Sequence, residues 1–254
     1  MLVRFFVIAF ALCWLITVPI ALQVQGVMPQ MLPPVLQWAI GFAPLIAAVW
    51  VTGGSDERTA WLAAATRLRV PAMWYVIAVL LPWIALAGAF CLRILLGKEP
   101  PHLAANATTP FFGLVWLVLA WGEEAGWRAF ALPRMIRGRG FWIAATTLGV
   151  LWCVWHYPKL YACPYLHFDA MSLKGIAQFS AQIVIANYLL CWLFVRTGSA
   201  VVTSVFHASF NLVATVHALA AIDPTLTIVM ALVTAGVLVA DRAALRNADA
   251  NVSR

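Results

Sequence analysis

The sequence has few charged residues. Asp, Glu, Lys and Arg make up 10% of the 254 residues, and 9 of these residues are acidic. Hydrophobic residues account for 64% of the chain, and the mean hydropathy is +0.92. A soluble domain of this size needs far more polar surface. The composition therefore excludes a soluble globular protein and indicates an all-α protein that crosses a membrane several times.

Several functional signatures are also missing. The chain has no glycine-rich phosphate loop, no internal repeat and no basic tract interleaved with aromatic residues, so nothing indicates a nucleic-acid partner. Its five cysteines show no C-x-x-C spacing, and four of them fall inside apolar runs. We interpret them as buried structural thiols rather than as zinc or redox groups.

The apolar residues gather in eight runs, and a spanning helix needs roughly 20 such residues. The runs lie near residues 5–22, 35–52, 73–96, 111–136, 141–157, 175–195, 199–218 and 224–240. The segments between them are too short for a separate soluble domain. We therefore predict one membrane domain over residues 1–240, a bundle of about eight transmembrane helices with a polar intramembrane cavity. A polar tail follows over residues 241–254.

The first run and the basic residues bear on topology. The first run follows Arg4 as in a signal peptide, but its length and the lack of a small-x-small site before Gln23 favour a retained helix. Positive charge accumulates on the cytoplasmic side, and an inside N-terminus puts 11 of the 16 basic residues there. Both termini are therefore predicted to be cytoplasmic. Short loops without an organelle-type extension are compatible with a bacterial inner membrane.

The segment over residues 56–70, between the second and third runs, mixes apolar and basic residues. Trp61 and Leu62 alternate there with Arg58, Arg67 and Arg69. This pattern is typical of an amphipathic stretch on the inner leaflet. A plain basic loop is the alternative.

A concentrated group of charges lies toward the end of the fourth run. Glu123 and Glu124 are adjacent, and Arg128 follows. An ionisable residue at the middle of a span costs at least about 2.5 to 3.5 kcal/mol, so this group needs partners or a function. Glu124 and Arg128 have the spacing of a helical ion pair. Neighbouring side chains diverge by about 100°, which leaves Glu123 on another face, free to act. A purely structural salt-bridge cluster is the alternative.

Two further polar clusters interrupt later runs. His156 closes an apolar run just before Pro158. Ser204, His207 and Asn211 are spaced i, i+3 and i+7, so they form one polar stripe on an apolar helix. In lipid such a stripe must face the bundle interior. There it either joins helices by hydrogen bonds or supplies chemistry, because a carboxylate, imidazoles and an amide can together activate water and hold an oxyanion.

The order of the motifs E-E-x-x-x-R, aromatic-x-x-x-H and H-x-x-x-N resembles the CPBP family of intramembrane proteases. This family includes the CAAX prenyl endopeptidases and the bacterial bacteriocin-processing and immunity (Abi) proteins. The resemblance covers about residues 111–220. The residues that match the three motifs in turn are Glu123, Glu124 and Arg128, then His156, then His207 and Asn211.

The resemblance implies a role for each residue. Glu123 would activate the hydrolytic water with His156, while His207 and Asn211 would stabilise the oxyanion. Trp152 stands where the second motif usually has phenylalanine, a conservative change at a packing position. The residues expected to support the reaction are Glu124, Arg128 and Ser204.

The dependence on a metal stays open at this point. Family members are often described as metalloproteases, and Glu123, His156 and His207 are also a zinc-hydrolase ligand set with an open fourth position. A metal-free glutamate–water mechanism explains the same residues, and we favour it. The alternative cofactor is a divalent metal such as zinc.

The depth of His156 conflicts with this assignment. At about 1.5 Å of rise per residue, Glu123 and His207 come out near the cytoplasmic face, and His156 about 10 Å deeper. We treat the other three histidines, which lack partners in these stripes, as non-catalytic: His102, His167 and His217. The polar residues of the sixth run are assigned to helix packing: Gln178, Gln182 and Asn187.

The sequence therefore predicts an intramembrane endopeptidase that hydrolyses a membrane-associated peptide, either prenylated or a leader peptide. Its expected partners are a peptide or protein substrate and the lipid bilayer. The alternative is a non-catalytic membrane protein, either an immunity factor that binds a hydrophobic peptide or a transporter. A transporter would show inverted repeats or paired broken helices, and the sequence has neither.

Overall fold

The structure is a computed structural model that describes residues 1–100, 103, 109–162, 172–216 and 224–250. The fold is all-α, as predicted. The helices of the first half are α1 (Leu2–Val24), the 3₁₀-helix η1 (Pro34–Phe42), α2 (Ala43–Val51), α3 (Ser55–Ala65) and α4 (Ala72–Leu95). Those of the second half are α5 (Thr109–Gly126), the π-helix η2 (Trp127–Ala131), α6 (Leu132–Ala162), α7 (Leu173–Thr197), α8 (Ala200–Val216), α9 (Pro224–Ala240) and α10 (Arg242–Ala250).

Each of the eight apolar runs has a helical counterpart in the described residues. By length and hydropathy, four of these segments can cross a membrane: α1, Pro34–Val51, α4 and α7. Helices α8 and α9 are apolar but shorter. Helix α5 ends in the two glutamates and α6 begins with three arginines, so both are less apolar. The count of about eight spans stays a prediction.

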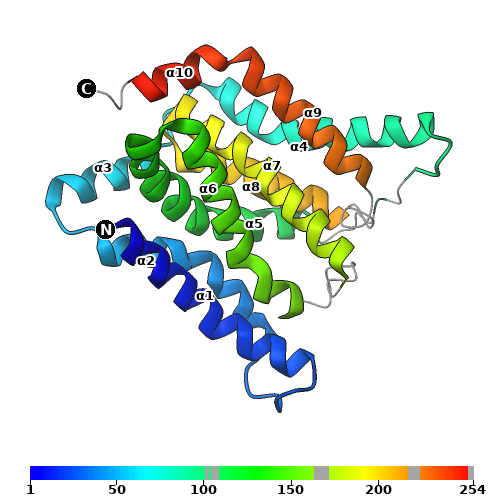
Figure 1. Cartoon of the computed structure of the whole chain (residues 1–254), viewed down its shortest axis with the longest axis horizontal. Coiled ribbons are helices and arrows are strands. Elements are labelled where there is room, and N and C mark those ends of the chain that lie inside the picture. The colour runs from blue at the N-terminus through cyan, green and yellow to red at the C-terminus, as the bar shows by residue number, and fades with distance from the viewer. Residues whose placement is uncertain (101–102, 104–108, 163–171, 217–223, 251–254) are drawn as a thin grey trace.

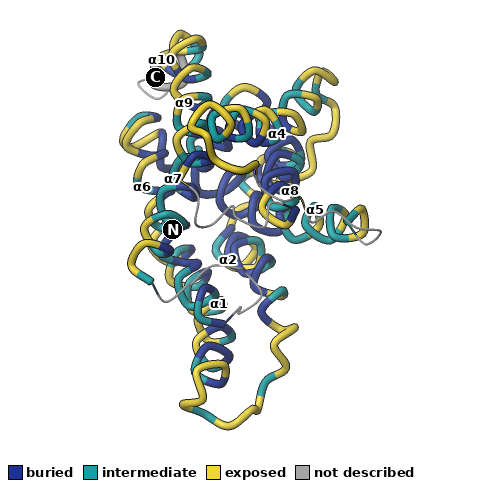
Figure 2. The backbone as a smooth tube through the Cα atoms, turned by 90° about the vertical axis from the view of Figure 1, so that its right-hand side faces the viewer, coloured by how far each residue is buried: buried dark blue, intermediate teal, exposed yellow. Residues whose placement is uncertain are grey.

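Helix α5 runs from the edge of the bundle inward, and its last residues, Gly122–Gly126, are buried (Figure 2). It packs against α8 on one side and against η1 and α2 on another. Helix α1 packs on α6 and α2, and α4 packs between α8 and α9. Buried residues concentrate in α7, in α8 and at the end of α5, whereas the loop after α1 is mostly exposed (Figures 1 and 2). The carboxylates at the end of α5 therefore reach the centre of the protein.

Small residues let α5 approach the η1–α2 segment. A Cβ atom added to Gly122 would lie 2.6 Å from the carbonyl oxygen of Gly41. A Cβ atom added to Gly126 would lie 2.4 to 2.5 Å from atoms of Pro44, including backbone atoms. Close backbone contact through small residues is a common way for membrane helices to associate. Gly122 and Gly126 thus bracket Glu123 and Glu124 with contacts that fix the end of α5.

The Gly126→Ala protein is expected to be less stable than wild type by about 1 to 3 kcal/mol, because the new methyl group must displace the backbone around Pro44. Gly236→Ala in α9 is the control, since an added Cβ there meets no atom within 4 Å and alanine is the better helix former. Thermal unfolding in detergent measures both. Equal melting temperatures for the two variants would contradict the close contact.

A π-helix and a sharp turn shape the chain after the glutamates. The π-helix η2 begins one residue after Gly126 and carries Arg128, and such segments often occur at functional sites. At Gly140 the backbone leaves the helical conformation, with φ of 76° and ψ of 168°. Glu123 and His156 lie almost equally far along the chain from Gly140, one before it and one after. The two residues therefore lie on two helical segments that this turn joins.

Two short segments that the sequence did not assign to spans, α3 and α10, are helical. Residues 55–65 form α3, whose Trp61 is 3% exposed and donates its indole N–H to the carbonyl of Ala125 at 2.8 Å. Trp61 therefore faces the protein and not the lipid leaflet, while Leu62 is exposed. The polar tail is helical over α10, where Leu245 is buried against the bundle.

Candidate active site

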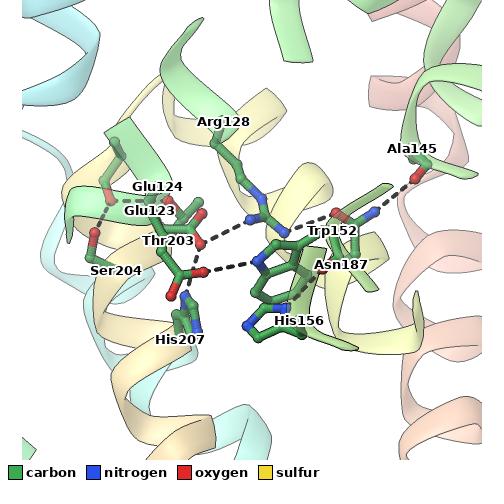
Figure 3. Close-up of polar contacts among 11 residues, drawn as sticks. Glu123, Glu124, Arg128, Ala145, Trp152, His156, Asn187, Thr203, Ser204 and His207 are labelled. Carbon is green, nitrogen blue, oxygen red and sulfur yellow. Dashed lines mark hydrogen bonds and ion pairs between the residues drawn. The ribbon is translucent and has the colours of Figure 1, made fainter. Parts of the chain in front are cut away.

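A buried ion cluster lies at the junction of α5, η2 and α8. Glu124 and Arg128 are fully buried, and Arg128 Nη1 donates to Glu124 Oε1 at 3.0 Å. This is the predicted i, i+4 pair. His207 on α8 donates from Nδ1 to the same oxygen at 2.9 Å (Figure 3). A carboxylate oxygen paired with arginine acts only as an acceptor, so Nδ1 of His207 carries the proton and Nε2 is left for another partner.

Asn187 on α7 completes this cluster. Its side-chain oxygen accepts a hydrogen bond from Arg128 Nη2 at 2.9 Å, and its amide nitrogen donates to the carbonyl of Ala145 at 2.8 Å (Figure 3). The residue is fully buried. A Cβ atom at Gly149 would lie 3.0 Å from the Asn187 amide nitrogen, so a small residue is needed there on α6. Arg128 is thus held from both sides in a fixed orientation.

Glu123 lies apart from the ion pair, as the helical geometry predicts. Its Oε2 accepts a hydrogen bond from the indole nitrogen of Trp152 on α6 at 2.8 Å. Its side chain points toward Trp152, while Glu124 points toward Arg128 and His207 (Figure 3). The two adjacent carboxylates therefore have different surroundings, and Glu124 is the one engaged with a positive charge.

His156 is buried among aromatic rings one turn beyond Trp152. Its ring meets those of Trp152, Trp155 and Phe179 edge to face, at centroid distances of 5.3, 4.7 and 5.8 Å. His156 Nδ1 lies 2.8 Å from the carbonyl oxygen of Trp152. A carbonyl only accepts, so Nδ1 carries the proton and Nε2 of the neutral ring is an acceptor.

The indole of Trp152 brings the separate motifs together. Besides its bond to Glu123, the ring lies 5.2 Å from the His207 ring and 5.3 Å from the His156 ring. The Arg128 guanidinium stacks over it at 4.5 Å. Helix α5, the π-helix, α6 and α8 thus all contribute to one site. His156 therefore lies beside the tryptophan that binds Glu123.

The other two residues of the predicted stripe on α8 are Ser204 and Asn211. Ser204 is buried, and its hydroxyl donates to the carbonyl of Ala200 at 2.6 Å in its own helix. Asn211 is half-buried one turn after His207. Within the described part of the chain, its amide makes no hydrogen bond to another site residue. Its assignment to the oxyanion stays a prediction.

The site residues do not fit a metal centre as they are arranged. Among the described residues, no group of three or more His, Cys, Asp or Glu side chains is placed to hold a metal ion. Glu123, His156 and His207 instead surround the indole of Trp152. The mechanism proposed for these residues therefore uses no metal.

An open apolar pocket lies between α1 and the end of α6. Its volume is about 330 Å³, within the range of small-ligand sites. The residues that line it include Trp14, Val18 and Leu22 on α1, and Tyr157, Pro158 and Tyr161 on α6. Tyr157 and Pro158 directly follow His156. The polar cavity predicted from the sequence stays a prediction, and this apolar pocket was not foreseen.

The sequence interpretation missed two residues of the site. Trp152 was assigned to packing, and Asn187 to helix packing within the sixth run. The available signals were the indole N–H, which phenylalanine lacks, and an amide in an otherwise apolar helix, which needs partners in lipid. Three histidines and one cysteine lie outside the described residues: His102, His167, His217 and Cys163.

Comparison with known proteins agrees with the motifs. Residues 105–213 match the family described as type II CAAX prenyl endopeptidase Rce1-like. The matched segment contains every motif residue from Glu123 to Asn211. The resemblance to CPBP-type proteases is therefore confirmed. A search of curated proteins finds no match to the chain.

Proposed function

Because residues 105–213 match the Rce1-like endopeptidase family, we propose that the protein is an intramembrane endopeptidase that uses water activated by Glu123. The observation that carries the proposal is the meeting of the motif residues of α5, α6 and α8 around Trp152. Their side chains supply a carboxylate base and two oriented imidazoles in a buried environment. Such groups are what water attack on a peptide bond requires.

In the proposed mechanism Glu123 removes a proton from water, and His156 Nε2 helps to orient that water. The tetrahedral oxyanion is stabilised by His207 Nε2 and the Asn211 amide. Since Nδ1 of His207 already donates to Glu124, donation from Nε2 requires the doubly protonated ring. Glu124 supplies the balancing negative charge. Glu123 then delivers its proton to the leaving amine.

The proposed substrate is a peptide that carries a large apolar group, such as a prenyl chain. The apolar pocket between α1 and α6 supports this choice, because Tyr157 and Pro158, which follow His156 in the sequence, line it. A peptide anchored there by its lipid would keep its polar backbone near the site. We also propose that both chain ends face the cytoplasm of a bacterial inner membrane, from the distribution of the basic residues.

Cleavage of quenched fluorescent peptides by the purified protein tests the proposal. A farnesylated CAAX peptide is expected to be cleaved at a higher kcat/KM than the same peptide without the lipid, because lipid binding contributes to transition-state stabilisation. A chelator is expected to leave the rate unchanged. Loss of cleavage with the chelator, restored by added zinc, would contradict the metal-free mechanism. Binding of these peptides without cleavage would contradict the enzymatic function.

A further inference from the structure

We propose that Trp152 is a positioning residue: its indole N–H holds Oε2 of Glu123 and so directs the other oxygen, Oε1, toward the water. The inference rests on the proposed function of Glu123 as the base. The hydrogen bond is 2.8 Å long, and Trp152 is fully buried. A well-formed bond to a charged acceptor is stronger than one between neutral groups. The indole therefore restrains the carboxylate more than apolar packing alone would.

The chemistry of the indole suits this role. An indole nitrogen donates one hydrogen bond and accepts none. Trp152 can therefore orient Glu123 without competing with it for a proton of the water. Phenylalanine, the usual residue at this motif position, has no donor, so a chain with phenylalanine would hold its glutamate in another way. In this protein the change from phenylalanine is more than a packing substitution.

The indole is itself held in place. Arg128 stacks over the ring at 4.5 Å, and this guanidinium is fixed by Glu124 and by Asn187. The ring also meets His207 edge to face at 5.2 Å. A stacked cation and flanking rings leave the indole few alternative orientations. Contacts from α7, the π-helix and α8 are thereby transmitted through Trp152 to the carboxylate of Glu123.

Trp152→Phe is expected to lower kcat by about 10- to 100-fold. This is the rate factor that corresponds to the free energy of one hydrogen bond to a charged group. KM is expected to change by less than about two-fold, because Trp152 positions the base and does not bind substrate. The matched control is Trp192→Phe. Trp192 is also buried and donates its indole N–H at 2.8 Å to a carboxylate, that of Asp241, in another part of the protein. This control is expected to keep the wild-type kcat.

A second measurement tests the bond itself, independently of activity and of the folding of Trp152→Phe. In protein labelled with ¹⁵N at the indole nitrogens, the Trp152 proton signal is expected to move upfield in Glu123→Gln, because the acceptor loses its charge. The Trp192 signal is expected to stay in place. If the chemical shift of the Trp152 indole proton is the same in Glu123→Gln as in wild type, the proposal is overturned.

Different results would overturn the proposed function and the role of Trp152. A wild-type protein that cleaves no peptide overturns the proposed function and, with it, the role of Trp152. An active wild type whose Trp152→Phe variant keeps the same kcat overturns the role of Trp152 alone. A variant that raises KM at unchanged kcat also overturns it, since it would place Trp152 in substrate binding.

Discussion

The Glu123→Gln protein is expected to lose peptide cleavage by about 10²- to 10⁴-fold, the usual contribution of a general base. Glutamine is nearly isosteric with glutamate, and its side-chain oxygen still accepts a hydrogen bond from Trp152. The melting temperature is therefore expected to stay within about 2 °C of the wild-type value, because the volume of the side chain and its hydrogen bond are both kept. Cleavage of the farnesylated peptide and thermal unfolding are measured on the same preparation.

Glu124→Gln is the matched control, one residue along the same helix. Glu124 is fully buried and accepts hydrogen bonds from Arg128 and His207. Its neutralisation leaves Arg128 without a counter-charge, so this variant is expected to lose stability as well as activity. Loss of activity at unchanged stability would therefore be specific to Glu123. Retention of cleavage by well-folded Glu123→Gln would show that another group activates the water.

The positions of the helices and the Glu124–Arg128 pair could be predicted from the sequence. Apolar runs long enough to cross a membrane have few alternatives to helices, because a membrane leaves backbone groups no other partners. The i, i+4 spacing of Glu124 and Arg128 fixes which glutamate pairs, and the structure contains that pair. Both inferences depend on local geometry alone, which is why they hold without knowledge of the fold.

The contacts between helices could not be predicted in the same way. Asn187 and Trp152 lie in apolar runs, where their spacing carries no information on which helix they face. The π-helix at Trp127–Ala131 is also absent from the prediction, because a uniform helical rise per residue does not include it. Polar atoms in a span indicate that partners exist, and the packing decides which ones.

The geometry of the site also depends on two glycines, which have no functional group. Gly122 and Gly126 allow α5 to lie against Gly41 and Pro44, and this contact sets where the glutamates emerge. A glycine within an apolar run is common in membrane helices, so nothing in the sequence separates these two from the others. Their importance follows from the distance to a neighbouring backbone, which only the structure supplies.

Arg128→Met is expected to destabilise the protein by about 3 to 5 kcal/mol, the cost of leaving a buried charge without its partner. Arg128 is fully buried, pairs with Glu124 and Asn187, and stacks on Trp152. The other oxygen of Glu124, Oε2, has no hydrogen-bond partner among the described residues. Loss of Arg128 therefore leaves that carboxylate with His207 alone. Unfolding in detergent with increasing denaturant measures the difference.

Arg134→Met is the control, because Arg134 makes the same kinds of contact at a position closer to solvent. It stacks over Phe130 at 3.9 Å and pairs with Glu57 at 3.1 Å. The Arg134 side chain is 11% exposed and that of Glu57 is 43% exposed. Because solvent reaches the carboxylate, this ion pair is expected to contribute about 0 to 1 kcal/mol. Adding Glu124→Gln to Arg128→Met removes the unpaired charge, so the double variant is expected to be more stable than Arg128→Met. If Arg128→Met costs no more than Arg134→Met, the buried cluster does not hold the site together. The hydrogen bond from Trp152 would then have to fix the position of Glu123 without it.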